Sequence, residues 1–290
     1  MLVLQGIVDG VLAGALYALM GSGLTLVFGV MEVINFAQGI IVVLGAYFTY
    51  TFASHLGVDP FVTLLLTIPI MFTLGYAVYM LLLRPIKRDR VIMSLLVMYA
   101  TAVVIEGVLD LIFGGTLVEV TASYGTGSLH LGSLDFPNVY LLAFGLSALL
   151  LAALYWILYH TKFGRSLRAT TQNLTAAKLV GINVDHVSAL TLGIGVGLGA
   201  AGGMLFGMTT PFNAASSYDL ISRLLVIVIL GGFGSVWGAG VAAIVMLVIE
   251  DVVAVVWSPV WGQTIFYLVL ALVLMFRPQG LFGRRLARAQ

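Results

Sequence analysis

The sequence predicts an all-α, polytopic membrane protein, and three observations lead to this fold class. Of its 290 residues, 61% are hydrophobic and only 9% are charged, whereas soluble domains carry about 25% charged residues. The mean hydropathy is +1.13. Apolar runs of about 20 residues recur along the whole chain, and each is long enough to cross a hydrocarbon core about 30 Å thick. We expect a single transmembrane domain over residues 1–290 with about eight or nine helices in the lipid bilayer.

The apolar runs define the expected spans in chain order. They lie at 5–30, 36–54, 60–83, 91–113, 138–160, 187–209, 220–235, 238–257 and 261–276. Two regions are ambiguous because 220–235 is short and because polar residues interrupt the apolar run at about 30–40. If either region re-enters the membrane without crossing it, the number of spans is eight.

Basic residues predict the topology. Twelve of the 13 Lys and Arg residues fall in three clusters: Arg84, Lys87, Arg88 and Arg90; Lys162, Arg165, Arg168 and Lys178; Arg277, Arg284, Arg285 and Arg288. The positive-inside rule makes all three cytoplasmic. The Gly/Ser/Thr-rich loop at about 114–137 then lies outside, the N-terminus outside and the C-terminus inside. No basic residue precedes the first apolar run, so we expect no cleavable signal.

Residues typical of enzymes are scarce. The chain has no Cys, which excludes thiolate metal sites and Cys nucleophiles. The four His residues lack the paired spacing of a zinc site, and the phosphate-binding loop Gly-x-x-x-x-Gly-Lys-Ser/Thr is absent. We expect no catalytic residue, no metal and no cofactor, and if ATP drives this protein, another chain must bind it.

Three ionisable residues within the later spans are informative, because each costs about 2.5–3.5 kcal/mol at the membrane centre. Glu250 and Asp251 are adjacent, and in the predicted topology they lie at a depth similar to that of Arg223 on the preceding span. We therefore predict an ion pair between the two spans. It is either a structural clamp or part of the lining of a translocation path.

The stretch Val33-Ile34-Asn35-Phe36-Ala37-Gln38-Gly39 places polar and glycine residues between two apolar runs. This pattern predicts a helix break. Broken membrane helices offer unpaired N–H groups that suit a substrate carboxylate. The alternative is a cytoplasmic turn with a polar N-cap.

Gly195, Gly199, Gly203 and Gly207 follow one another at four-residue spacing. They therefore lie on one helix face that another backbone can approach closely. The face is either a sliding or dimerising surface or an ordinary packing surface within the chain.

The residues 161–186 are predicted to form a cytoplasmic segment that contains a short amphipathic helix and a turn. Its candidate contact residues are Gly164, Arg165, Arg168, Ala176, Ala177, Gly181 and Ile182. Small residues rimmed by charges suit docking into a groove on a soluble partner. A helix held at the interface by anionic lipid is the alternative.

Taken in order, these pieces resemble the permease family of branched-chain amino acid ABC importers, of the LivH type. The resemblance covers nearly the whole chain. It rests on Tyr17-Ala18-Leu19 through Val33–Gly39, Gly164-Arg165, Arg168-Ala169, Ala176-Ala177, Gly181-Ile182, Leu230-Gly231-Gly232-Phe233-Gly234-Ser235 with Gly238, and Pro278-Gln279-Gly280-Leu281-Phe282-Gly283-Arg284.

The resemblance implies a subunit of a bacterial inner-membrane importer of leucine, isoleucine or valine. Its partners would be a second, related permease, two cytoplasmic ATPases and a periplasmic binding protein, with no nucleic acid. The segment 164–182 resembles the coupling helix of ABC permeases, although Thr175 stands where the family pattern has Glu. Alternating access would open a path for which Asn35, Phe36, Gln38 and Gly39 are the first candidates, and Arg223, Glu250 and Asp251 the second.

Two alternatives stay open at this stage. Urea and short-chain amide permeases of the same family look similar. A stand-alone channel or ion-coupled carrier would use the acids Glu106, Asp110, Glu250 and Asp251 as proton or cation sites, and would need neither an ATPase nor a coupling segment.

Overall fold

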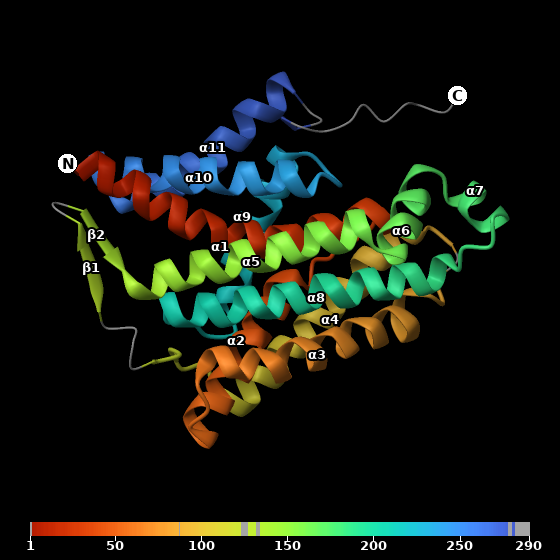
Figure 1. The fold of residues 1–290 in the computed structure, drawn as a ribbon, viewed down its shortest axis with the longest axis horizontal. Coiled ribbons are helices and arrows are strands. Elements are labelled where there is room, and N and C mark those ends of the chain that lie inside the picture. Colours follow the sequence, from red (N-terminus) through yellow and green to blue (C-terminus); the bar gives the residue numbers. More distant parts are fainter. Residues whose placement is uncertain (1, 87, 123–126, 132–133, 278–279, 282–290) are drawn as a thin grey trace.

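The computed structural model describes residues 2–86, 88–122, 127–131, 134–277 and 280–281. Within these ranges the chain is a bundle of helices, which confirms the predicted all-α membrane fold (Figure 1). Lys87 and most of the third basic cluster (Arg284, Arg285 and Arg288) lie outside the described residues, as does most of the motif that runs from Pro278 to Arg284.

The elements follow the predicted spans within a few residues. They are α1 (Leu2–Met31), α2 (Gln38–Leu56), α3 (Pro60–Val78) with the π-helix η1 (Tyr79–Leu83), α4 (Arg90–Phe113), β1 (Ser128–Leu131), β2 (Leu134–Pro137), α5 (Asn138–His160), α6 (Lys162–Gln172), α7 (Leu174–Leu179), α8 (Val184–Thr209), α9 (Ser216–Gly231), α10 (Val236–Val256) and α11 (Pro259–Phe276). In this described part, eight helices are long and apolar enough to cross a membrane. The exception among the predicted spans is α9, which has only 16 residues.

Close glycine contacts fix the directions of the central helices. Along α1, Gly10, Gly14 and Gly29 approach Val248, Ile244 and Gly234 in turn, so α10 runs antiparallel to α1. Gly23 approaches Gly195 and Met20 approaches Gly202, so α8 also runs antiparallel to α1. The long helices α8 and α10, which only the short α9 separates in the sequence, are therefore parallel. The chain between them must return across the bundle, and residues 210–235, including the short α9, make this crossing.

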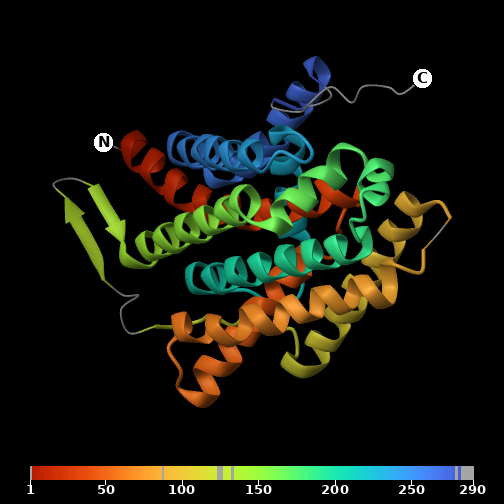
Figure 2. The ribbon, with the colours of Figure 1, turned by 45° about the vertical axis from the view of Figure 1, so that its right-hand side comes forward.

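The bundle contains two similar units of opposite direction (Figures 1 and 2). In one unit α1 and α3 are parallel, and in the other α8 and α10 are parallel; α1 packs along α10 while α3 packs along α8. The second helix of each unit, α2 or α9, begins inside the bundle after an extended connection. Inverted repeats with such broken helices are typical of membrane transporters.

The four glycines of α8 pack inside the chain. A Cβ on Gly195 would meet Val27 and Gly23 of α1, one on Gly199 would meet Gln38, and one on Gly203 would overlap the carbonyl group of Val42 in α2. These residues bring α8 against α1 and α2 of the same chain, so the glycine face packs within the chain rather than against another molecule. Close backbone approach also maximises van der Waals contact, which replaces hydrophobic driving force in lipid.

The two ends of the bundle differ. At one end α6 and α7 extend beyond the long helices, and at the other end β1 and β2 form an antiparallel hairpin (Figure 1). The hairpin falls in the region predicted only as a loop. The end with the hairpin is closed further by Val118, which pairs with Phe212 in an isolated β-bridge, so that the loop after α4 covers the end of α8.

Candidate functional site

The predicted break between the first two spans is present and buried. The first helix ends at Met31, Glu32 has a positive φ of 53°, and α2 starts at Gln38. Asn35 and Gln38 are both fully buried. Asn35 Nδ2 donates to Gln38 Oε1 at 3.1 Å, and Gln38 Nε2 donates to the carbonyl oxygen of Gly195 at 3.4 Å. The break is therefore part of the core rather than an exposed cytoplasmic turn, and its amides join α2 to α8.

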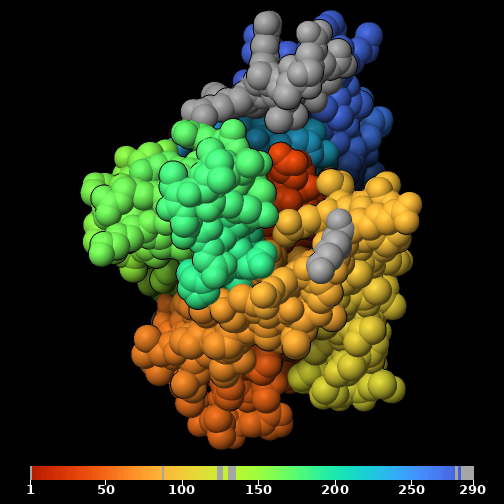
Figure 3. Space-filling view, turned by 90° about the vertical axis from the view of Figure 1, so that its right-hand side faces the viewer, coloured from red at the N-terminus to blue at the C-terminus, as the bar shows by residue number. Residues whose placement is uncertain are grey.

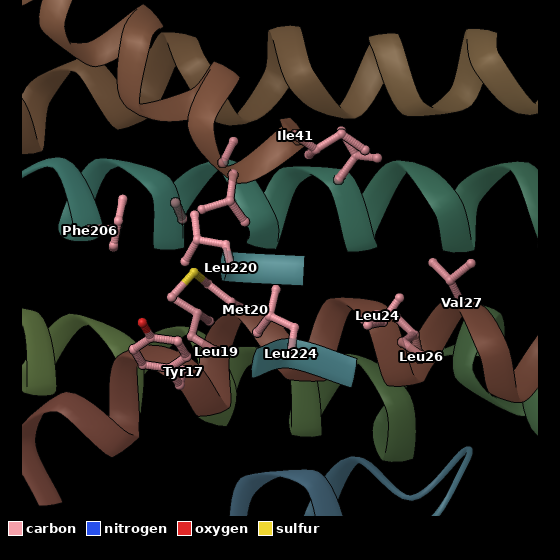
Figure 4. Packing of buried hydrophobic residues seen from close by; sticks show 14 of the residues in the cluster. Tyr17, Leu19, Met20, Leu24, Leu26, Val27, Ile41, Phe206, Leu220 and Leu224 are labelled. Carbon is pink, nitrogen blue, oxygen red and sulfur yellow. The ribbon is translucent and has the colours of Figure 1, made fainter. Parts of the chain in front are cut away.

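The first turns of α2 and α9 meet in the interior. A Cβ on Gly39 would overlap the carbonyl oxygen of Ser217 and approach Ile221 closely, so only glycine permits this crossing. Figure 4 shows Leu220 and Leu224 of α9 between α1 and the helix α8, beside Met20. Sequence reasoning identified the α2 side of this junction. The α9 side was missed, although the polar run Asn213 to Ser217 beside a short apolar segment was a usable signal.

The predicted ion pair between α9 and α10 is confirmed for Glu250. Arg223 Nη1 donates to both carboxylate oxygens of Glu250, at 2.8 and 2.7 Å, and Arg223 Nε donates to Asp219 at 2.8 Å. The guanidinium also lies 5.6 Å from the ring centroid of Phe266 in α11. Within the described residues Asp251 makes no such bond with Arg223; its backbone packs instead against Gly6 of α1.

The junction and the ion pair are linked through α9. Ser217 and Ile221, which touch Gly39, lie on the same helix as Asp219 and Arg223. A displacement of α9 would therefore change the contact with Gly39 and the ion pair with Glu250 at the same time. Among the described residues no group of three His, Asp or Glu side chains is arranged to hold a metal ion.

The predicted cytoplasmic segment forms α6 and α7, and several of its candidate contact residues are structural. The Thr161 side chain caps α6 by accepting from the Gly164 amide at 3.1 Å. A Cβ on Gly164 would overlap the carbonyl oxygen of Leu158. Arg168 donates to that same carbonyl and lies 5.0 Å from the Tyr159 ring centroid. Gly164 and Arg168 therefore hold α6 against the end of α5.

The exposed part of this segment is the tip of α7. Arg165, Ala176 and Gly181 are exposed, whereas Ala177 is buried and Ile182 is half-buried against the core. The largest exposed apolar side chains are Leu179 and Val180, with 84% and 76% of their surface accessible. Sequence reasoning did not select them, although two apolar residues beside Lys178 in a polar segment are unusual. Figure 3 shows α6 and α7 in green projecting toward the viewer beside the end of α1 in red.

Comparison with known proteins identifies the family. The model of the family described as "Branched-chain amino acid transport system / permease component" matches residues 6–275. The chain belongs to this permease family. It is therefore a multi-pass membrane permease of the LivH type, as the resemblance of its motifs implied.

Individual relatives match over nearly the full length of this permease. It is 27% identical to the high-affinity branched-chain amino acid transport system permease protein BraD of Pseudomonas aeruginosa, over 97% of this chain and 96% of that protein. It is 26% identical to LivH of Escherichia coli over the same shares of the two chains. The probable LivH of Methanocaldococcus jannaschii is 26% identical over 92% of this chain and 89% of its own. No solved structure matches this permease.

Proposed function

We propose that this permease is the membrane subunit of an ATP-driven, binding-protein-dependent importer of branched-chain amino acids in a bacterial inner membrane. In the complete importer it pairs with a second permease, two cytoplasmic ATPases dock below it, and a periplasmic binding protein delivers leucine, isoleucine or valine from above. One observation carries this proposal: α6 and α7 project from an otherwise membrane-embedded bundle and expose the apolar tip Leu179 and Val180 directly after the basic residue Lys178.

The tip of α7 suits insertion into a groove on a soluble partner. Apolar anchors rimmed by charged residues are typical of a helix that docks into a hydrophobic groove. Gly181 follows the C-cap of α7 and has a positive φ of 83°, so the chain turns at once toward α8. Any force on the tip is passed to α8, whose Asp185 forms an ion pair with Arg84 at 3.4 Å and accepts from Tyr79. ATP hydrolysis on the docked subunits would thus reach the bundle through α7 and α8.

The translocation path is proposed to open by alternating access at the α2–α9 junction. Asn35, Phe36, Gln38 and Gly39 lie there, where two helices begin in the interior and their N-terminal dipole ends favour a carboxylate. Arg223, Glu250 and Asp251 are second-rank candidates, because the bonds of Arg223 to Glu250 must be kept or exchanged as α9 moves.

The docking assignment is tested with the double substitution Leu179→Asp and Val180→Asp. We expect the rate of substrate uptake to fall at least tenfold. The ATPases should also be lost when the double variant is purified in mild detergent. The matched control is Leu129→Asp on the opposite end, which is 50% exposed and should leave the ATPases bound. A double variant that retains its ATPases and transports normally contradicts the assignment.

A second variant tests coupling rather than binding. Replacing Gly181 by a bulky residue strains its left-handed backbone and widens the turn that follows α7. We expect ATP hydrolysis to become independent of transport. Normal coupling in a folded Gly181 variant would remove this residue from the proposed mechanism.

A further inference from the structure

The first turn of α8, which closely follows the exposed tip of α7, rests on two tyrosines. The Tyr79 hydroxyl donates to Asp185 Oδ1 at 3.3 Å, and the Tyr76 hydroxyl lies 3.3 Å from His186 Nδ1. Tyr76 belongs to α3, and Tyr79 is the first residue of η1 and is fully buried. Polar contacts therefore join the start of α8 to the end of α3.

Two arginines extend these contacts to α4. Arg84 Nε lies 3.4 Å from Asp185 Oδ2, and Nη2 of Arg90, the first residue of α4, donates to the Tyr79 hydroxyl oxygen at 3.3 Å. We refer to Tyr79, Arg84, Arg90 and Asp185 as the Asp185 cluster. The side chains of its ion pair are 58% and 50% exposed, so this pair contributes little to stability and is easily exchanged.

The Asp185 cluster depends on the π-helical turn of η1. The Arg84 amide donates to the Tyr79 carbonyl oxygen at 2.8 Å, so these two residues lie one turn apart and both reach Asp185. In an α-helix, residues five positions apart lie about 140° apart around the axis. A return of η1 to α-helical geometry would therefore turn Arg84 away from Tyr79 and break its ion pair with Asp185.

The local sequence does not require this π-helical turn. The segment Tyr79–Leu83 reads Tyr-Met-Leu-Leu-Leu, which contains no Gly or Pro, and Leu and Met favour the α-helix. Pro85 follows, but Pro is also common one or two residues beyond the end of an ordinary α-helix. The contacts of Tyr79 and Arg84 with Asp185 are the tertiary interactions that favour the π-helical turn. Such turns are rare and occur frequently at functional sites.

The helix that follows η1 is loosely packed. Of the 24 residues of α4, only Ser94, Met98 and Leu109 are buried. A small apolar cavity separates α4 from α3 and α8, and its lining includes Val78, Met98, Ile105, Leu192 and Val196. A shift of α4 against α3 therefore disrupts few packed contacts.

We propose that Asp185 and Tyr79 are positioning residues that set α4 against α3, and that η1 returns to α-helical geometry and moves α4 when docked ATPases draw the start of α8 away. This inference rests on the proposed function for the ATPases. It deepens that function by naming the residues that pass a movement of α7 and α8 on to α4.

The first test measures coupling in the complete transporter, reconstituted in lipid vesicles with leucine as the substrate. Asp185→Asn and Tyr79→Phe remove the contact with little change in side-chain size. We expect the number of ATP molecules hydrolysed per leucine imported to rise at least fivefold in both variants. Asp185→Glu retains a carboxylate and should bring this ratio back toward that of the parent. A purely structural defect would lower the amount of complex without changing the ratio.

Asp89→Asn is the matched control. Asp89 is also an acidic residue at the start of a helix; its side chain is 65% exposed and lies 3.9 Å from Arg88. We expect Asp89→Asn to leave the ratio of ATP to leucine unchanged. The inference is overturned if Asp185→Asn and Tyr79→Phe also keep the parent ratio.

The second test follows α4 directly. Because the chain has no native Cys, nitroxide labels at Leu65→Cys on α3 and Val104→Cys on α4, both exposed positions, report the distance between these helices in the intact complex. We expect this distance to differ between the nucleotide-free complex and the complex trapped with ATP and vanadate. Asp185→Asn should reduce the difference by at least half. An identical distance in the two states of the parent complex overturns the inference.

Failure of this inference can be distinguished from failure of the proposed function. If the ATPases stay bound and leucine import needs ATP, but the variants of the Asp185 cluster behave like the parent, only this inference fails. If the parent chain purifies from its native membrane without ATPases, the proposed function fails, and the inference fails with it.

Discussion

Arg223 is buried in the membrane-embedded part of the chain and is held there by two carboxylates on different helices. A buried charge that loses its partner is strongly destabilising, because the remaining charge stays desolvated. The side chain of Glu250 is about as buried as that of Arg223, whereas that of Asp219 is more than half exposed. The two bonds of Arg223 therefore differ in what they contribute to stability.

We predict that Glu250→Gln lowers the free energy of unfolding by about 3–5 kcal/mol, because Arg223 then keeps only its more exposed partner. Asp219→Asn should lower it by less than about 1 kcal/mol, as expected for a solvent-exposed pair. Thermal unfolding of the purified chains in detergent measures the difference. Equal melting of the two variants would show that burial does not determine the strength of these contacts.

Glycine at position 203 permits the contact between α8 and α2. Gly203→Ala places a methyl group on the Val42 carbonyl, and overpacking of this kind costs about 1–3 kcal/mol. We expect a lower melting temperature for Gly203→Ala and no decrease for Gly240→Ala, since a Cβ on Gly240 meets nothing within 4 Å. If Gly203→Ala leaves the melting temperature unchanged, then α8 and α2 can move apart at this contact without a loss of stability.

At the scale of elements, the connection 32–37 is a strained feature of the fold. Glu32 is exposed and adopts a left-handed conformation, which costs about 1–2 kcal/mol for a residue with a Cβ. The hydrogen bonds of Asn35 and Gln38 hold the connection in place. The strain is therefore offset by buried polar contacts in the core.

We predict that Glu32→Gly raises stability by about 1 kcal/mol, because glycine adopts this conformation without a steric penalty. Glu32→Val should lower it, since a β-branched residue is especially unfavourable at positive φ. Melting of the two variants against the parent chain gives the comparison. Destabilisation by glycine would indicate that the carboxylate of Glu32 makes a contact more important than the strain.

At the scale of the whole molecule, the topology depends on whether the segment that contains the short α9 crosses the bundle from one end to the other. Because α8 and α10 are both antiparallel to α1, the turn that contains Phe233 lies at the same end as α7. The tilted contact of the Phe233 and Phe28 rings, with centroids 4.3 Å apart near the end of α1, agrees with this placement.

We predict that Phe233→Cys and Leu174→Cys are labelled by an impermeant maleimide only after the cells are permeabilised. Thr116→Cys, on the loop after α4, should be labelled in intact cells because it lies at the opposite end. If Phe233→Cys instead behaves like Thr116→Cys, the chain between α8 and α10 turns back and does not cross.

Much of this protein follows from the sequence alone. The apolar runs predicted the long helices, because hydrocarbon of fixed thickness requires helices of fixed length. Polar residues in an apolar run predicted the break at Asn35, and the cost of an isolated charge in the membrane predicted a partner for Arg223. The family resemblance of the motifs also agrees with the matched family model.

Only the tertiary structure decided which residues meet. The contact of Gly39 with Ser217, the choice of Glu250 over Asp251 and the meeting of Glu106 with Tyr218 join segments separated by more than 20 residues. In the same way, Gly164 and Arg168 proved to support α6, while Leu179 and Val180 form the exposed tip. Length and polarity of a segment fix its place relative to the membrane, but the rotation and neighbours of each helix depend on how side chains pack between helices.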